Sequence, residues 1–334
     1  MKILFRVDAG NKIGVGHFYR SLSLAQQLEK RGHEVIFTHL KSTFWDSEIQ
    51  NGFPFKQIEL DSLNSENQTY EFISKQKIQV FYVDGIIDFN EDFIDKIKKN
   101  VKVVFYQNLS ASKVFADIFI LPSIHQEDIF FQSFSKKTKI YRGLEFFTFN
   151  PLILKLEQKE KLNQELSIVA VAAGGSDPNN TLLAIYKFAC GQVNKNIKFV
   201  FYFGKDFLHK KSIPSKLPNG IQFHLFNHTD ILKHDLLITA FGVSTYEFLY
   251  LGMPILSYGH QESNARASNY LESQTNSLIS LGEISKLSNK KFESAFVEIE
   301  KFSIRKKLTS NAKKMLDLNG TKRIVKIIED SNLT

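Results

Sequence analysis

The most constraining feature of the sequence is a regular alternation between short apolar runs and amphipathic stretches along the whole chain. Ile3–Val7 has the length of a buried strand, and His17–Arg31 then has the spacing of a helix with one apolar face. Glu34–Thr38 predicts the next strand. Strands that alternate with helices form a parallel sheet flanked by those helices. The sequence therefore predicts an α/β fold of the doubly wound, Rossmann-like type.

The pattern pauses once, in a polar stretch near the middle of the 334-residue chain, which exceeds the usual size of a single core. We therefore expect an N-terminal domain over 1–150, a linker over 151–165 and a C-terminal domain over 166–334. Because ligands of such sheets bind at the carboxyl ends of the strands, the two domains should face an interdomain cleft. The other predicted strands are Val80–Val83, Val101–Tyr106, Ile118–Leu121, Ser167–Ala172, Lys198–Phe203, Gln222–Phe226, Leu236–Thr239 and Ile255–Tyr258.

Composition narrows the class of protein. The single cysteine, Cys190, excludes an internal disulfide framework and fits a reducing compartment. The first apolar run is too short for a signal peptide, and no run reaches the ~18 residues of a membrane span, so a cytoplasmic protein is expected. The net charge of +8 suits an anionic substrate or an acidic membrane surface. Nucleic acid is a weaker interpretation, because the lysines are dispersed and no nucleic-acid-binding motif accompanies them.

Three glycine-marked turns each lie between a predicted strand and a predicted helix. In the first, Gly14 and Gly16 let the backbone approach a ligand closely, and His17 follows at the helix start. The positive end of a helix disfavours a protonated imidazole, and a neutral imidazole can act as a general base. A histidine that only caps the helix is the alternative. The flanking glycines favour the functional interpretation.

The second and third turns have the composition of anion-binding helix starts. Glu247 falls in the first turn of the third helix, where it would compensate the helix dipole or hold a pair of ribose hydroxyls. The candidate substrate- or phosphate-binding residues of these two turns are Gly174, Gly175, Ser176, Gly242, Ser244 and Thr245.

Several other chemistries find no support in the sequence. The third glycine of a dinucleotide fingerprint is replaced by Tyr19, and the end of the second strand carries Thr38 and His39 where an NAD site needs an acid. There is no Walker A lysine and no Gly-x-Ser-x-Gly elbow. His224 and His228 have a spacing that can bind metal on a helix, but their surroundings predict strand and loop, with no carboxylate or cysteine cluster nearby. We therefore expect a metal-independent protein without a cofactor.

The motifs resemble, in order, those of the PseG family, the nucleotide-sugar hydrolases of pseudaminic acid biosynthesis, which are related in fold to MurG and SpsG. The resemblance implies a two-domain GT-B enzyme in which water attacks the anomeric carbon of a UDP-linked diacetamido-trideoxy sugar with inversion. It implies that His17 activates the water and that the other two turns bind the diphosphate and the uridine ribose. Asp8 is a further candidate for phosphate binding, and Asp84, His260 and Gln261 are candidates on the sugar side. The segments that carry the resemblance are Arg6–Asp8, Ile13–Arg20, Gly174–Asn179, Ser244–Glu247 and Gln261.

The sugar-facing segments differ from the family pattern. Gln107 and Asn108 stand where the family has an acidic pair, and His260 stands where it has an asparagine. Asp8, Asp84 and Arg20 are functional or fix the loop that presents His17, and for Arg20 structural support is favoured. A glycosyltransferase is therefore the alternative to a hydrolase, with an acceptor hydroxyl in place of water and peripheral membrane contact through the apolar stretch 124–134. A nucleotide-sugar binder without activity is the third hypothesis, and the oligomeric state stays open.

Overall fold

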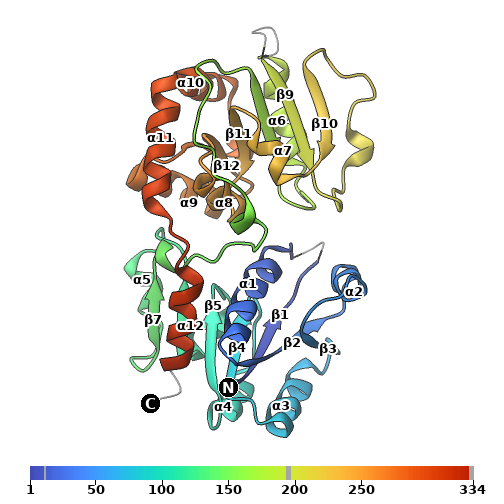
Figure 1. The fold of residues 1–334 in the computed structure, drawn as a ribbon, viewed down its shortest axis with the longest axis vertical. Helices are drawn as coiled ribbons and strands as arrows, with labels where there is room; N and C mark the ends of the chain where they lie inside the picture. Colours follow the sequence, from blue (N-terminus) through green and yellow to red (C-terminus); the bar gives the residue numbers. More distant parts are fainter. Residues whose placement is uncertain (11–12, 193–196, 331–334) are drawn as a thin grey trace. The chain divides into compact units, whose positions relative to one another are not determined.

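The computed structural model describes residues 1–10, 13–192 and 197–330, which divide into two compact units. Unit 1 contains residues 1–154 together with the segment from Leu318 onward, and unit 2 contains Lys155–Asp317. Each unit holds one parallel sheet with its helices (Figure 1). The predicted fold class, two doubly wound α/β sheets, is confirmed.

Unit 1 is built on a seven-stranded sheet in the order β3-β2-β1-β4-β5-β6-β7. The chain starts at β1 and adds strands first on one side and then on the other, so the strand order reverses between β1 and β4. Apolar side chains on the two faces of the sheet form two separate cores. The elements are β1 (Lys2–Val7), α1 (Gly16–Lys30), β2 (Glu34–Leu40), α2 (Thr43–Gln50), β3 (Lys56–Leu60), α3 (Ser65–Gln76), β4 (Val80–Asp84), α4 (Glu91–Lys98), β5 (Lys102–Tyr106), β6 (Ile118–Leu121), α5 (Asp128–Phe131), β7 (Lys139–Arg142) and α12 (Gly320–Asp330).

Unit 2 repeats this plan with a six-stranded sheet in the order β10-β9-β8-β11-β12-β13. Its strand order reverses between β8 and β11. The elements are β8 (Ile168–Ala172), α6 (Thr181–Cys190), β9 (Lys198–Phe203), β10 (Ile221–Leu225), α7 (His228–Leu232), β11 (Leu236–Ala240), α8 (Val243–Tyr250), β12 (Ile255–Gly259), α9 (Glu262–Thr275), β13 (Ile279–Glu283), α10 (Asn289–Glu300) and α11 (Phe302–Met315).

The C-terminal helix α12 departs from the predicted domain division. It packs against α1, and its apolar residues Ile324, Val325 and Ile328 belong to the same core as the strands of unit 1 (Figure 1). Gly320 begins this helix, and a Cβ there would lie 2.0 Å from the backbone oxygen of Phe147. The expectation that one continuous C-terminal domain covers 166–334 therefore does not describe the packing of α12.

The segment predicted as a linker is bound to unit 2 along part of its length. The Lys159 ammonium group donates to the backbone oxygens of Leu232 and His234, at 3.0 and 2.6 Å. The buried Arg305 guanidinium donates to the backbone oxygens of Asn163 and Gln164. The contact division falls between 154 and 155, so most of the predicted linker packs as part of unit 2.

Candidate functional site

The register of the strands in unit 1 creates the first candidate site. Asp84, the last residue of β4, pairs with Val7 at the end of β1 on one side and with Tyr106 at the end of β5 on the other. Helix α1 begins at Gly16, shortly after β1, and carries His17, Arg20 and Ser21. Residues spaced by three and four positions share one helix face, so all three side chains can reach the end of β4.

The side chains of this group contact one another closely, and we call His17, Arg20, Asp84 and Gln107 the His17 cluster. Nδ1 of His17 lies 3.1 Å from Oδ1 of Asp84 and 2.7 Å from Nη2 of Arg20. Arg20 also donates through Nε to Oδ2 of Asp84 at 2.7 Å and through Nη1 to Oε1 of Gln107 at 2.6 Å. The Ser21 hydroxyl donates to Oδ2 of Asp84 at 2.9 Å.

Burial and charge fix the ionisation of the buried groups in this cluster. Burial alone would raise the pKa of Asp84, which is 0% exposed, but the Arg20 guanidinium and the contact with His17 outweigh it, and the pKa is lowered. Burial would lower the pKa of Arg20, but the Asp84 carboxylate outweighs it and raises that pKa. Asp84 is therefore an anion and Arg20 a cation at neutral pH, and they form a buried pair.

His17 is the titratable member of the cluster that reaches solvent. Its side chain is 21% exposed, whereas that of Arg20 is 3% exposed. The ring lies against Gly85, where a Cβ would be 3.8 Å from Cγ of His17. Nδ1 lies within hydrogen-bonding distance of both Asp84 and Arg20, so Nε2 is the ring nitrogen that does not face this buried pair. This arrangement, in which a buried carboxylate orients an imidazole, is common to many general bases.

Backbone hydrogen bonds join the two sides of the first turn. Gly10 and Gly14 exchange backbone hydrogen bonds of 2.7 and 3.2 Å, and Gly14 has a φ of +86°, which favours glycine. Gly16 is the first residue of α1. The positive φ explains the glycine at position 14, and the predicted ligand contacts of Gly14 and Gly16 stay predictions.

Asp8 has partners within the protein. Its carboxylate accepts two hydrogen bonds from Arg6, of 3.1 and 2.9 Å, and a third from the backbone N–H of Leu40 at 2.8 Å. These contacts join the ends of β1 and β2. The geometry supports a structural role for Asp8, and its predicted phosphate contact stays a prediction.

In unit 2, the second predicted turn follows β8 at the carboxyl edge of the sheet. Gly174 has a φ of +54°, and the backbone of Gly175 passes so close to Gly204 that a Cβ on Gly204 would lie 2.0 Å from the Gly175 oxygen. Half-exposed Ser176 follows. The two strands β8 and β9 thus hold the turn in place through a glycine that the sequence analysis did not single out.

The start of helix α6 is occupied by a side chain of the protein. The Asp177 carboxylate accepts hydrogen bonds from the backbone N–H groups of Thr181 and Leu182, each at 2.9 Å, and from the Thr181 hydroxyl at 2.8 Å. Two of the N–H groups that an anion would use are therefore already bonded. In this segment, the backbone that is still available to contact a ligand is that of the turn at Gly174 and Gly175.

The residues of the third turn differ in how far they are exposed to solvent. Oγ1 of the buried Thr245 accepts from the backbone N–H of Gly242 at 3.2 Å, so this side chain closes its own turn. Ser244 is half-exposed at the start of α8. Glu247 is 4% exposed and lies beyond the first turn of α8, which contains no acidic residue, so its predicted place in the first turn is wrong. The predicted anion contacts are therefore geometrically accessible at Gly242 and Ser244 rather than at Thr245.

The remaining predicted residues, His260 and Gln261, are exposed between β12 and α9. Desolvation by the surrounding protein lowers the pKa of the His260 imidazole, and the Asp177 carboxylate opposes that shift. Strands β8, β11 and β12 are neighbours in the sheet, so the second turn, the third turn and His260 share the carboxyl edge of unit 2. The structure thus places the predicted residues at two sheet edges, one in each unit.

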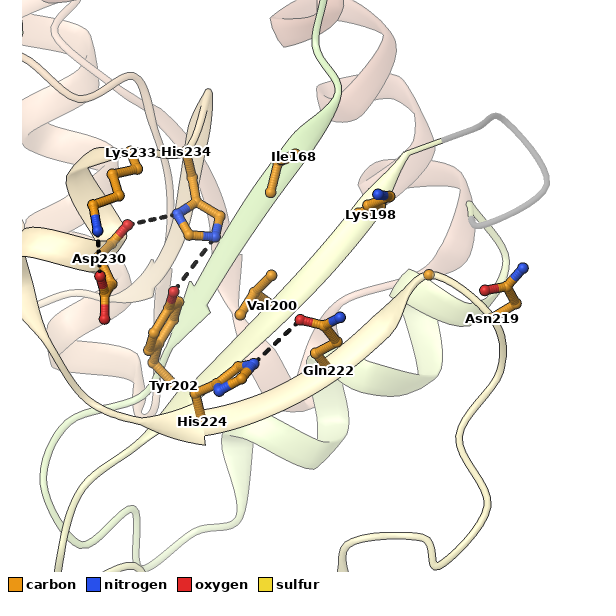
Figure 2. Close-up of a pocket in the computed structure, with 11 residues that line it drawn as sticks. Ile168, Lys198, Val200, Tyr202, Asn219, Gln222, His224, Asp230, Lys233 and His234 are labelled. Carbon is orange, nitrogen blue, oxygen red and sulfur yellow. Dashed lines mark hydrogen bonds and ion pairs between the residues drawn. The ribbon is translucent and has the colours of Figure 1, made fainter.

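A separate cavity of about 480 Å³ opens on unit 2 and contains none of the predicted residues. Figure 2 shows its wall formed by β8, β9 and β10 on one side and the α7 region on the other. Within it, the Tyr202 hydroxyl lies 3.4 Å from Nε2 of His234, whose Nδ1 lies 2.8 Å from the backbone oxygen of Asp230. Ile168 and Lys198, the first residues of β8 and β9, line it, so the cavity extends toward the amino ends of these strands rather than toward the glycine turns.

Sequence reasoning missed the roles of Gln107 and Ser21 and placed Arg20 as structural support without identifying its partners. The spacing of His17, Arg20 and Ser21 on one helix face was the available signal.

Among the described residues, no three His, Cys, Asp or Glu side chains gather as ligands for a metal ion. No helix in the described ranges is long and apolar enough to cross a membrane.

Two Rossmann-like units of this kind define the GT-B fold of glycosyltransferases, and solved structures of that fold match the chain over nearly its whole length. The MurG protein of Acinetobacter baumannii matches with a TM-score of 0.65 and 12% identity, over 99% of this chain and 100% of the other. The glycotransferase of kitacinnamycin matches with a TM-score of 0.69 and 12% identity, over 98% of each chain. UGT89C1 of Arabidopsis thaliana in complex with UDP-L-rhamnose matches with a TM-score of 0.66 and 15% identity, over 97% of this chain and 98% of the other.

Two curated proteins are similar in sequence. The spore coat polysaccharide biosynthesis protein SpsG of Bacillus subtilis is 22% identical over 97% of this chain and 96% of its own length. An uncharacterized protein of Methanocaldococcus jannaschii is 28% identical over 77% of this chain, and the match spans 55% of that longer protein. No family model matches the chain. The chain is thus a GT-B protein related to MurG in fold and to SpsG in sequence.

Proposed function

We propose that this chain is an inverting nucleotide-sugar enzyme in which His17 is the general base, and that its first candidate reaction is hydrolysis of a UDP-linked, diacetamido-trideoxy-like sugar. The observation that carries the proposal is the partly exposed imidazole of His17, whose Nδ1 faces the buried carboxylate of Asp84. The resemblance of the sequence motifs to PseG supports the substrate class and a role in surface-glycan biosynthesis.

In this reaction a water molecule attacks the anomeric carbon while Nε2 of His17 takes its proton. The new carbon–oxygen bond forms on the face opposite the bond to the diphosphate, which breaks, and UDP leaves with both electrons of that bond. The mechanism requires the tautomer with the proton on Nδ1, in which Nδ1 donates a hydrogen bond to Asp84, and this carboxylate then stabilises the imidazolium that forms, as in other histidine bases.

Unit 2 supplies the nucleotide side in this proposal. Backbone N–H groups at Gly174, Gly175 and Ser244 hold the diphosphate, since uncharged backbone groups at a sheet edge stabilise a leaving anion without a metal. Glu247 holds the ribose, and His260 with Gln261 contacts the sugar. The reaction then needs one base and positioning, and no cofactor.

Glycosyl transfer is the second candidate, because the solved structures with this fold include glycosyltransferases and the SpsG relative is named for polysaccharide biosynthesis. His17 would then deprotonate an acceptor hydroxyl. The apolar stretch 124–134, which was expected to contact a membrane in a glycosyltransferase, gives this candidate little support. Ile129 is 69% exposed, but Phe130 and Phe134 pack on Phe119.

The test measures UDP release from a panel of UDP-sugars without acceptor. His17→Ala should lower turnover by roughly 10²–10⁴-fold, the usual contribution of a general base, with UDP affinity unchanged in calorimetry. His224→Ala, an exposed histidine of unit 2, is the matched control and should retain activity. UDP release only after a glycan or lipid-linked acceptor is added would establish the transferase instead. Equal turnover of wild type and His17→Ala in every assay would contradict both enzymes and favour a nucleotide-sugar binder.

A further inference from the structure

Gln107 holds an unusual position directly after β5. Its φ is +49°, in the left-handed region that side chains other than glycine rarely adopt. Its backbone N–H donates to the oxygen of Ile120 at 2.8 Å, which continues the pairing of β5 with β6. The backbone is therefore fixed, and the side chain turns toward α1, where Oε1 accepts from Nη1 of Arg20 at 2.6 Å.

Arg20 contacts both Gln107 and His17 and so connects the two residues. One end of its guanidinium group donates to Gln107, and the other end lies 2.7 Å from Nδ1 of His17. The group is 3% exposed and stacks on the Tyr106 ring, with 4.9 Å from Cζ to the ring centre. A planar group held at both ends and on one face has a single orientation, so the Gln107 amide helps to decide where Nη2 lies relative to the imidazole.

The imidazole of His17 faces one positive and one negative charge. From α1 it faces the Arg20 cation, and from β4 the Asp84 anion. Burial raises the pKa of Tyr82 well above its ordinary value and that of Tyr106 to about 12, so both phenols are neutral near pH 7. The Gln107 amide adds no charge. A second carboxylate at this position would leave the cluster with a net negative charge beside the ring.

We propose that Gln107 is a positioning residue that acts through Arg20: it anchors the guanidinium group beside His17 and, unlike an acidic residue at 107, adds no negative charge to the His17 cluster. The inference rests on the proposed role of His17 as the base. Gln107 does not touch the reacting atoms in this account.

The variant that tests the proposal is Gln107→Glu, which keeps the size of the side chain and an oxygen for Arg20 but adds a charge. A nearby carboxylate favours the protonated imidazole, so the acid limb of the pH–rate profile for UDP release should move to higher pH by about one unit. Gln107→Asp is the second charged variant, because aspartate tolerates a left-handed backbone.

Gln79→Glu is the matched control. Gln79 also uses Oε1 as an acceptor, from the backbone N–H of Lys2 at 3.1 Å, but it lies just before β4, at the opposite end of that strand from Asp84. A strand of this length separates the two ends by roughly 15 Å, so the added charge should leave the pH–rate profile unchanged.

A second measurement does not depend on turnover. The ring signals of the histidines are followed by NMR against pH, and the His17 signal is assigned by its loss in His17→Ala. Its midpoint should move to higher pH in Gln107→Glu and Gln107→Asp but not in Gln79→Glu. An unchanged midpoint in both folded variants at position 107 would overturn the proposal. A midpoint that moves while the pH–rate profile stays fixed would retain the positioning role and refute His17 as the base.

Discussion

The carboxyl edges of the two sheets are built on different principles. In unit 1 the edge is a network of charged side chains, where Asp84 and Arg20 are buried and His17 alone of the His17 cluster's charged or titratable members is partly exposed. In unit 2 the edge consists of glycine turns and helix starts, where Asp177 and Thr245 bond to the backbone of their own turns. A charged network fixes one reactive group precisely in space, whereas a backbone edge presents N–H groups that suit an anion. The proposed function assigns the base to the first kind of edge and the binding of the diphosphate to the second.

If the charged side chains stabilise the carboxyl edge of unit 1, removing Arg20 should lower the free energy of unfolding more than any other change considered below. Arg20→Met leaves the Asp84 carboxylate buried, with Ser21 and His17 as its remaining side-chain partners among the described residues. Removing one partner of a buried pair costs about 3–5 kcal/mol. We expect the free energy of unfolding in urea to fall by this amount, with the loss of hydrogen-exchange protection greatest in β1 and β4.

Arg31→Met is the control for this variant. Arg31 follows the same helix and pairs with Glu329 at 2.7 Å, but its side chain is 55% exposed. Exposed pairs contribute little, so this change should alter the free energy of unfolding by less than about 1 kcal/mol. Equal effects of the two substitutions would show that the buried network does not hold the edge.

The edge of unit 2 should instead be sensitive to backbone crowding. In Gly204→Ala the new methyl group would lie 2.0 Å from the backbone oxygen of Gly175, so the turn must move. Such overpacking costs about 1–3 kcal/mol, and UDP affinity should fall with it. Gly175→Ala is the matched control, because a Cβ there meets nothing within 4 Å. It should leave the free energy of unfolding nearly unchanged and lower UDP affinity only, and the reverse pattern would contradict this account of the turn.

The fold was predictable where strands are buried on both faces. Central strands such as β4 and β8 consist largely of continuous apolar runs, which can be recognised as buried strands without knowing which strands lie beside them. Strands β3 and β7, at the two edges of the first sheet, mix charged and apolar residues and gave no such signal. Helix α12 shows a further limit, because an apolar helix face predicts burial but not the unit that buries it.

The site was predictable as separate residues and not as a cluster. His17 and Asp84 were both candidates, but they are 67 positions apart, and their contact depends on β4 lying next to β1. Strand order cannot be deduced from hydrophobic periodicity. Asp177 shows the opposite case: the composition of its turn predicted an anion at a helix start, and the anion that the structure places there is the carboxylate of the chain itself.

Asp177 provides the smallest and most specific test of the comparison. Asp177→Ala removes the acceptor of two backbone N–H groups at the start of α6, and losing such a cap costs about 1 kcal/mol. It also frees those groups for an external anion, so inorganic phosphate should raise the thermal midpoint of the variant more than that of wild type. Asp177→Asn keeps an acceptor oxygen and tolerates the φ of +43° at this position, so it should lie close to wild type in both measurements. If phosphate stabilises all three proteins equally, the start of α6 is not an anion site even when vacated, and the anion contacts of unit 2 are confined to the glycine turn and α8.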